Sequence, residues 1–205
     1  MQRPIGSLFV FALFCVLSAR AGAAAIELSL FSSDVTPAEV LDALLEFSVV
    51  GDELTLTVSN NTSDPSPFEI NEIAFNATAE VTNLSLTSGL NDWSLRFDQT
   101  PGGNHGMDGF GRFDVILEWG GGRRPTILPG EKAIFTFAVE GEGFSDLSFV
   151  TDLSSIPPGA MEMLLVAKFI RGPNDDSAFG AVPEPRSLGL LALGGLVMMW
   201  QRRGT

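Results

Sequence analysis

The middle of the chain alternates apolar and polar residues with a period of two, and this pattern restricts what it can fold into. Successive side chains of a strand point to opposite faces, so the pattern is typical of strands with one face in a core. Clusters of Gly, Pro and Asn separate the runs, as turns do. The alternating runs are 54–59, 84–87, 113–119 and 133–139, and the run 161–170, apolar on both faces, predicts a central strand.

One segment departs from this pattern. Thr36-Pro37-Ala38-Glu39 has the composition of a helix N-terminus, with threonine as N-cap, proline at the first position and glutamate at the third. Val40, Leu41, Leu44 and Leu45 follow at helical spacing and predict two or three turns. Many short strands and one short helix predict an all-β fold, a two-sheet antiparallel sandwich of jelly-roll or immunoglobulin-like type. The strand order stays open.

Charge limits the partners of this domain, which we place at residues 26–170. The chain between residues 26 and 182 carries 24 acidic and only 7 basic residues. Nucleic acids and anionic membrane surfaces bind through clustered cations, so this composition argues against both as partners. It fits an acidic domain that repels its own copies and stays soluble outside the cell.

The N-terminal segment has the three parts of a secretory signal. Arg3 is the positive region, Ile5–Leu17 is an apolar run of 13 residues, and small residues follow. As a helix this run is about 20 Å long, which is short for a membrane span of about 30 Å. We therefore predict a signal peptide over residues 1–25, with cleavage after Ala23 or Ala25. Cleavage would remove Cys15, the single cysteine.

The C-terminal segment has a similar composition. Residues 171–181 contain Gly and Pro and predict a linker. Pro183-Glu184-Pro185 then precedes an apolar run, Leu188–Trp200, and the basic pair Arg202-Arg203. The run predicts a short transmembrane helix, and basic residues stay on the cytoplasmic side, so the acidic domain would lie outside.

This tail, residues 182–205, resembles the PEP-CTERM sorting domain. The resemblance rests on Pro183, Glu184 and Pro185, on the apolar helix and on Arg202 and Arg203 at the terminus. It implies that a membrane protease-transpeptidase, the exosortase, cuts near the motif after signal peptidase has acted. It also implies an association with exopolysaccharide and biofilm in Gram-negative bacteria. An ordinary short tail anchor is the alternative for this segment.

The sequence predicts no enzyme. His105 is the only histidine and lies in a Gly-rich segment, where we expect a solvated loop residue, and no Gly-x-Ser-x-Gly motif accompanies it. No catalytic residue, cofactor or metal ligand is therefore assigned. Calcium stays open, because irregular calcium sites leave little trace in sequence. Trp93 and Trp119 share apolar faces and predict core positions rather than sugar-binding platforms.

These observations lead to one expectation for the whole chain. We expect a non-catalytic protein that crosses the inner membrane, is transiently anchored by its tail, and ends at the cell surface or in the extracellular matrix. Its processing partners would be signal peptidase and exosortase, and exopolysaccharide would be its surroundings. The alternative is an extracellular glycan-binding module or weak glycan hydrolase on the same fold.

Overall fold

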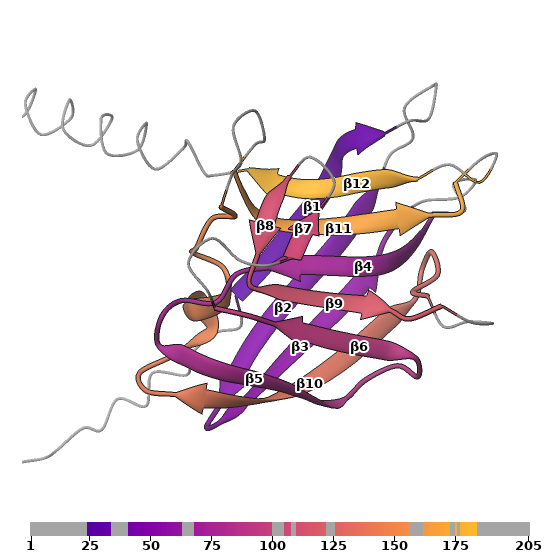
Figure 1. The fold of residues 1–205 in the computed structure, drawn as a ribbon. Helices are drawn as coiled ribbons and strands as arrows, with labels where there is room; N and C mark the ends of the chain where they lie inside the picture. Colours follow the sequence, from indigo (N-terminus) through magenta and orange to yellow (C-terminus); the bar gives the residue numbers. More distant parts are fainter. Residues whose placement is uncertain are drawn as a thin grey trace, which may run out of the picture.

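The computed structural model describes residues 24–33, 41–62, 68–99, 105–107, 110–121, 126–155, 162–172, 175 and 177–183. Nearly all the regular structure in these ranges is β-strand, and one short 3₁₀ helix interrupts it (Figure 1). The elements are β1 (Ala24–Ser33), β2 (Asp42–Val50), β3 (Glu53–Asn60), β4 (Glu69–Phe75), β5 (Val81–Ser88), β6 (Trp93–Phe97), β7 (His105–Met107), β8 (Gly111–Phe113), β9 (Val115–Trp119), β10 (Lys132–Gly141), η1 (Asp146–Phe149), β11 (Met163–Ile170) and β12 (Ala178–Pro183).

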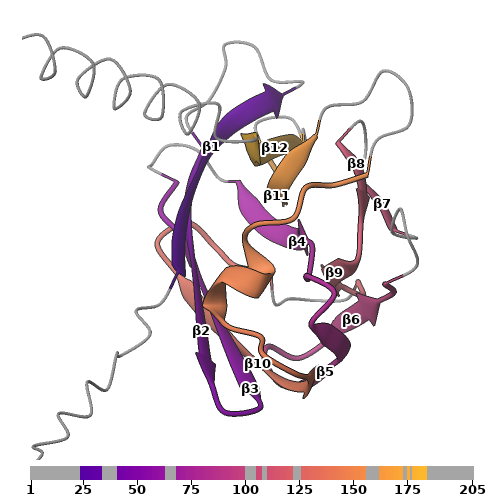
Figure 2. The same cartoon turned by 90° about the vertical axis from the view of Figure 1, so that its left-hand side faces the viewer.

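Ten of these strands form one antiparallel sheet that folds over on itself. Its order is β5-β10-β3-β2-β1-β12-β11-β4-β9-β6. The half from β5 to β1 faces the half from β12 to β6 across the core, as Figure 2 shows. The all-β antiparallel fold agrees with the prediction. Because β1 and β12 pair with each other, the two facing halves belong to one continuous sheet.

The alternation of the sequence places the core between the two halves. On β2, β3 and β10 every second residue is buried, whereas the residues between them are partly or fully exposed over most of each strand. The core is rich in phenylalanine, which has a large apolar surface to bury. Its largest fully buried side chains are those of Phe47, Phe68, Phe75, Phe113, Phe135, Phe137, Phe149 and Phe169.

Strand β11, in the opposite half of the sheet, is buried on both faces over most of its length, as the run 161–170 predicted. Leu165 and Phe169 of β11 pack into the main core, whereas Val166 joins a second apolar cluster on the other face. The two-stranded sheet β7–β8 covers this second cluster with Met107 and Phe113. The run 113–119 is therefore divided at Asp114, with β8 in the small sheet and β9 in the large one.

The predicted helix after Thr36 is wrong where the structure describes the segment. Residues 36–40 lie outside the described ranges, and β2 begins at Asp42. Leu41, Ala43, Leu45 and Phe47 are buried at every second position. The apolar residues of this segment are compatible with the period of a helix and with that of a strand. Pairing with β1 on one side and β3 on the other stabilises the strand.

The predicted linker, residues 171–181, is also different in the structure. Ala178–Pro183 form β12, which lies between β1 and β11 and pairs with both. Ala178 and Ala181 of this strand are buried. The small residues Ala178, Gly180 and Ala181 suit this position, because β12 is an interior strand with β1 on one side and β11 on the other. The last strand of the folded domain therefore contains Val182 and Pro183, the first residues of the predicted tail.

Candidate functional site

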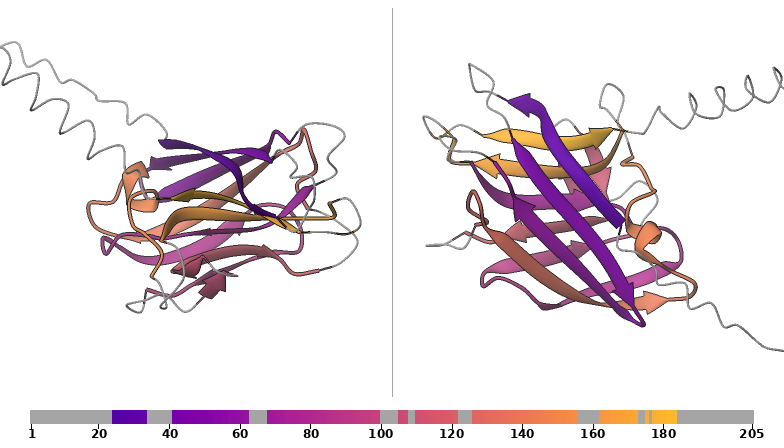
Figure 3. Two further views of the ribbon diagram at one scale, coloured as in Figure 1. Left: turned by 90° about the horizontal axis from the view of Figure 1, so that it is seen from above. Right: turned by 180° about the vertical axis from the view of Figure 1, so that it is seen from behind.

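The paired strands β1 and β12 connect the folded domain to the two segments that the sequence marks for processing. In their register Ser29 lies opposite Ala181 and Ser33 opposite Ala178, with one irregularity between Leu30 and Ser32. Because the pair is antiparallel, β1 begins at the same end of the sheet at which β12 finishes (Figure 3). Both predicted processing regions therefore join the domain at one end.

The register also gives the separation of the two junctions. Continued from Ser29 and Ala181, it places Pro183 opposite Glu27, three residues from Ala24. At about 3.4 Å per residue, the start of β1 and the end of β12 are about 10 Å apart along the strands. On its other side Pro183 lies opposite Met163 of β11. The first residue of the Pro-Glu-Pro motif thus belongs to the sheet.

Some of the predicted site residues lie within the described residues and others lie outside them. Ala25 is exposed in β1 and lies opposite Glu46 of β2. Pro183 is the last residue of β12. The remaining predicted residues, Ala23, Glu184, Pro185, Arg202 and Arg203, lie outside the described residues, as do the predicted signal and transmembrane helices.

A buried carboxylate marks the place where β1 begins. Asp146, the first residue of η1, is 4% exposed, and its Oδ1 accepts a hydrogen bond from the backbone N–H of Val49 at 2.5 Å. In Figure 1 the η1 helix lies beside the start of β1. Sequence reasoning missed this residue, because one aspartate among 24 acidic residues gives no signal before its strand partner is known.

His105 is more enclosed than the sequence predicted. It begins β7 instead of lying in a solvated loop, and it is half-buried. Its Nε2 is shielded from solvent, with no hydrogen-bond partner in the described part of the chain. Burial lowers the pKa of His105 below its ordinary 6.5, and the nearby Arg96 lowers it further, while Asp98 and Glu118 oppose them. The imidazole is therefore neutral at pH 7.

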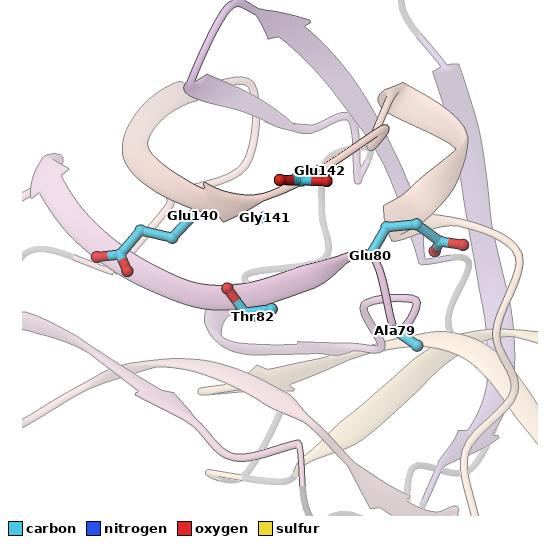
Figure 4. A pocket seen from close by; sticks show the side chains of 6 residues that line it. All are labelled: Ala79, Glu80, Thr82, Glu140, Gly141 and Glu142. Carbon is cyan, nitrogen blue, oxygen red and sulfur yellow. The ribbon is translucent and has the colours of Figure 1, made fainter.

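An acidic hollow lies at the free end of the first half-sheet. It has a volume of about 580 Å³ and is lined by residues at the start of β5 and the end of β10, among them Glu80, Glu140 and Glu142. Figure 4 shows the side chains of Glu80 and Glu140 pointing away from each other. Within the ranges that the structure describes, no three His, Cys, Asp or Glu side chains could share a metal ion.

The two tryptophans that we expected in the core differ. Trp93 is 7% exposed and packs against Phe135, with ring centroids 5.0 Å apart and planes tilted by 50°, which confirms the prediction for this residue. Trp119 is only partly buried, and the guanidinium of Arg171 lies 5.6 Å from its ring. Arg171 also pairs with Glu69 at 2.6 Å. The indole of Trp119 therefore lies between the core and an ion pair.

Among the residues described, no helix has the length and apolar character needed to cross a bilayer. Comparison of the chain with protein-family models, with curated proteins and with solved structures finds no match.

Proposed function

We propose that this chain is an exported, exosortase-sorted protein of the cell surface or extracellular matrix, non-catalytic and associated with exopolysaccharide. One combination carries the proposal: a signal-like segment at residues 1–25 and, after the domain, Pro183-Glu184-Pro185 with an apolar run and Arg202-Arg203. The acidic domain would lie outside the inner membrane, held by the tail until the tail is cut.

The arrangement of the end strands supports this topology. A signal segment and a tail that enter the same membrane must both leave the domain toward it. Because β1 begins where β12 ends, both segments can do so without crossing the domain. The folded-over sheet fits the sandwich architecture shared by jelly-roll and immunoglobulin-like domains, which is common among cell-surface proteins.

Mass spectrometry of both termini of the protein recovered from its host tests the proposal. The expected mature protein begins within residues 24–26 and ends near Pro183-Glu184-Pro185. A variant with alanine at these three positions should stay in the membrane fraction with its tail attached. Alanine at Pro157 and Pro158, a proline pair elsewhere in the chain, is the control and should be processed normally. Normal processing of the triple-alanine variant would overturn the proposal.

A further inference from the structure

The carboxylate of Asp146, at the start of η1, is buried. Removing an ionised carboxylate from water costs several kcal/mol, and such groups are normally paired with a cation or with several donors. Asp146 is 4% exposed, and within the described part of the chain its side chain accepts a hydrogen bond from the backbone N–H of Val49. A cation close to this carboxylate would offset part of the cost of burial.

The register of β1 shows what lies beside this carboxylate. Ala24 is opposite Phe47 of β2, so a strand continued by two residues would bring residue 22 opposite Val49. The backbone N–H of Val49 donates to Asp146 instead of to a strand partner. The carboxylate of Asp146 therefore lies beside β2 at the position that β1 would reach if it were extended beyond Ala24. From the spacing of an antiparallel ladder, the nitrogen of Ala24 is about 5 Å from this carboxylate.

We propose that the signal peptide is cut between Ala23 and Ala24 and that the freed α-ammonium of Ala24 pairs with Asp146. The inference deepens the proposed export and rests on it. Hydrolysis breaks the amide bond between the two alanines: water leaves a carboxylate on Ala23, and the nitrogen of Ala24 becomes an ammonium. An amide nitrogen without charge is thereby replaced by a cation beside the buried carboxylate.

The alternative cleavage after Ala25 does not produce this pair. It would remove Ala24, which packs against the main core, and it would break the pairing of two residues with β2. The new ammonium would belong to Ile26, opposite Leu45, about 7 Å further from Asp146. The two sites that the sequence offers are therefore not equivalent in the folded domain.

Among the residues that the structure describes, the other charged groups considered at this end are acidic or paired. Glu46 of β2 lies opposite Ala25 and pairs with Lys132 of β10 at 3.9 Å. Asp52 follows β2, and Glu142 and Asp152 flank η1 in the chain. These carboxylates would raise the pKa of any nearby amine, so the test must isolate the contribution of Asp146.

The experiment uses mature protein recovered from the host. Mass spectrometry identifies the first residue, and labelling with an amine-reactive reagent between pH 6 and 10 gives the titration midpoint of the N-terminal amine. Asp146→Asn keeps an oxygen for the N–H of Val49 but removes the charge. Asp152→Asn, an exposed carboxylate just after η1, is the matched control. A synthetic peptide that begins Ala24-Ala25-Ile26 gives the midpoint of a free amine, ordinarily near 7.7–8.0.

The expected result is a first residue Ala24 and a labelling midpoint about one pH unit above that of the peptide, a tenfold change in proton affinity. Asp146→Asn should lose most of this shift, and Asp152→Asn should keep it. A first residue Ile26, or equal midpoints for the protein and the peptide, would overturn the inference while leaving export intact. A chain that still begins at Met1 would overturn both the inference and the proposed export.

Discussion

Phe149 of η1 lies parallel to Phe47 of β2, with ring centroids 6.4 Å apart and an interplanar angle of 4°. Phe75 of β4 meets both rings edge-on, at 5.2 Å from Phe47 and 6.4 Å from Phe149. The three rings come from the two halves of the folded sheet and from the only short helix in the described ranges. Aromatic pairs of this geometry contribute beyond their buried area, so this cluster closes the core at the η1 end.

Phe149→Ala should lower the free energy of unfolding by about 3–5 kcal/mol, because it removes a fully buried ring and leaves a cavity between two others. Chemical denaturation of the purified domain measures the change. Leu147→Ala is the control, since this side chain lies on the same helix but is 61% exposed. Its effect should stay within about 0.5 kcal/mol. Equal losses for both variants would mean that η1 does not close the core through Phe149.

Asn60→Ala should be destabilising by about 2–4 kcal/mol. The buried side-chain amide of Asn60 donates to the carbonyl oxygens of Phe68 and Ile127, each at 2.9 Å. Its removal leaves the carbonyl of Phe68 and the N–H of Thr62 without this partner, whereas the carbonyl of Ile127 still accepts from the N–H of Ile70. An unsatisfied buried group costs about 1–3 kcal/mol. Asn61→Ala, at the exposed neighbour, should change stability little. Thermal unfolding of the two variants makes the comparison, and a small effect at Asn60 would contradict the expectation.

Ionisation of Asp114 should lower the stability of the domain as the pH rises through the pKa that this carboxyl group has in the folded state. Burial raises the pKa of Asp114 above its ordinary 3.8, and the nearby Asp152 and Asp98 raise it further, although the backbone N–H of Ala77 opposes them. The folded state then holds this proton more tightly than the unfolded state. Stability from this group is therefore full below pH 3.8 and declines as the pH rises through the higher folded pKa.

Asp114→Asn tests this dependence. The variant cannot ionise, so its melting temperature relative to the unmodified protein should be higher at pH 7 than at pH 3.5. The control Glu162→Gln, at an exposed carboxylate, should show a smaller difference between the two pH values. If the melting temperature of Asp114→Asn relative to the unmodified protein is instead lower at pH 7 than at pH 3.5, the surroundings of Asp114 stabilise its ionised carboxylate.

Removal of β12 should prevent the domain from closing. A chain that ends after Ser177 lacks the strand that pairs with β1 and β11 and buries Ala178 and Ala181. Its two neighbours would then expose unpaired edges, which promote aggregation. A chain that ends after Pro185 keeps β12. The first truncation should be found mainly in the insoluble fraction and the second in the soluble fraction; equal solubility would show that β12 is dispensable.

Much of the fold followed from local pattern. The alternating runs predicted β3, β5 and β10, and the run apolar on both faces predicted the interior strand β11. The segment around Leu44 was predicted wrongly, because its apolar spacing fits a helix as well as a strand and only pairing with β1 and β3 distinguishes them. The linker prediction did not anticipate β12, residues 178–183, for a related reason. Small residues and a proline are typical of linkers, and only pairing with β1 and β11 makes this segment a strand.

The candidate site divides in the same way. The acidic β-domain and the two flanking motifs could be predicted before folding was considered, because composition, alternation and short motifs are local properties. Three features follow from contacts in the folded chain: Pro183 belongs to β12, β1 and β12 join the two halves, and Asp146 accepts a hydrogen bond from Val49. These contacts link residues far apart in the chain, such as Asp146 and Val49, 97 positions apart, and local patterns do not encode which distant strand a residue will meet.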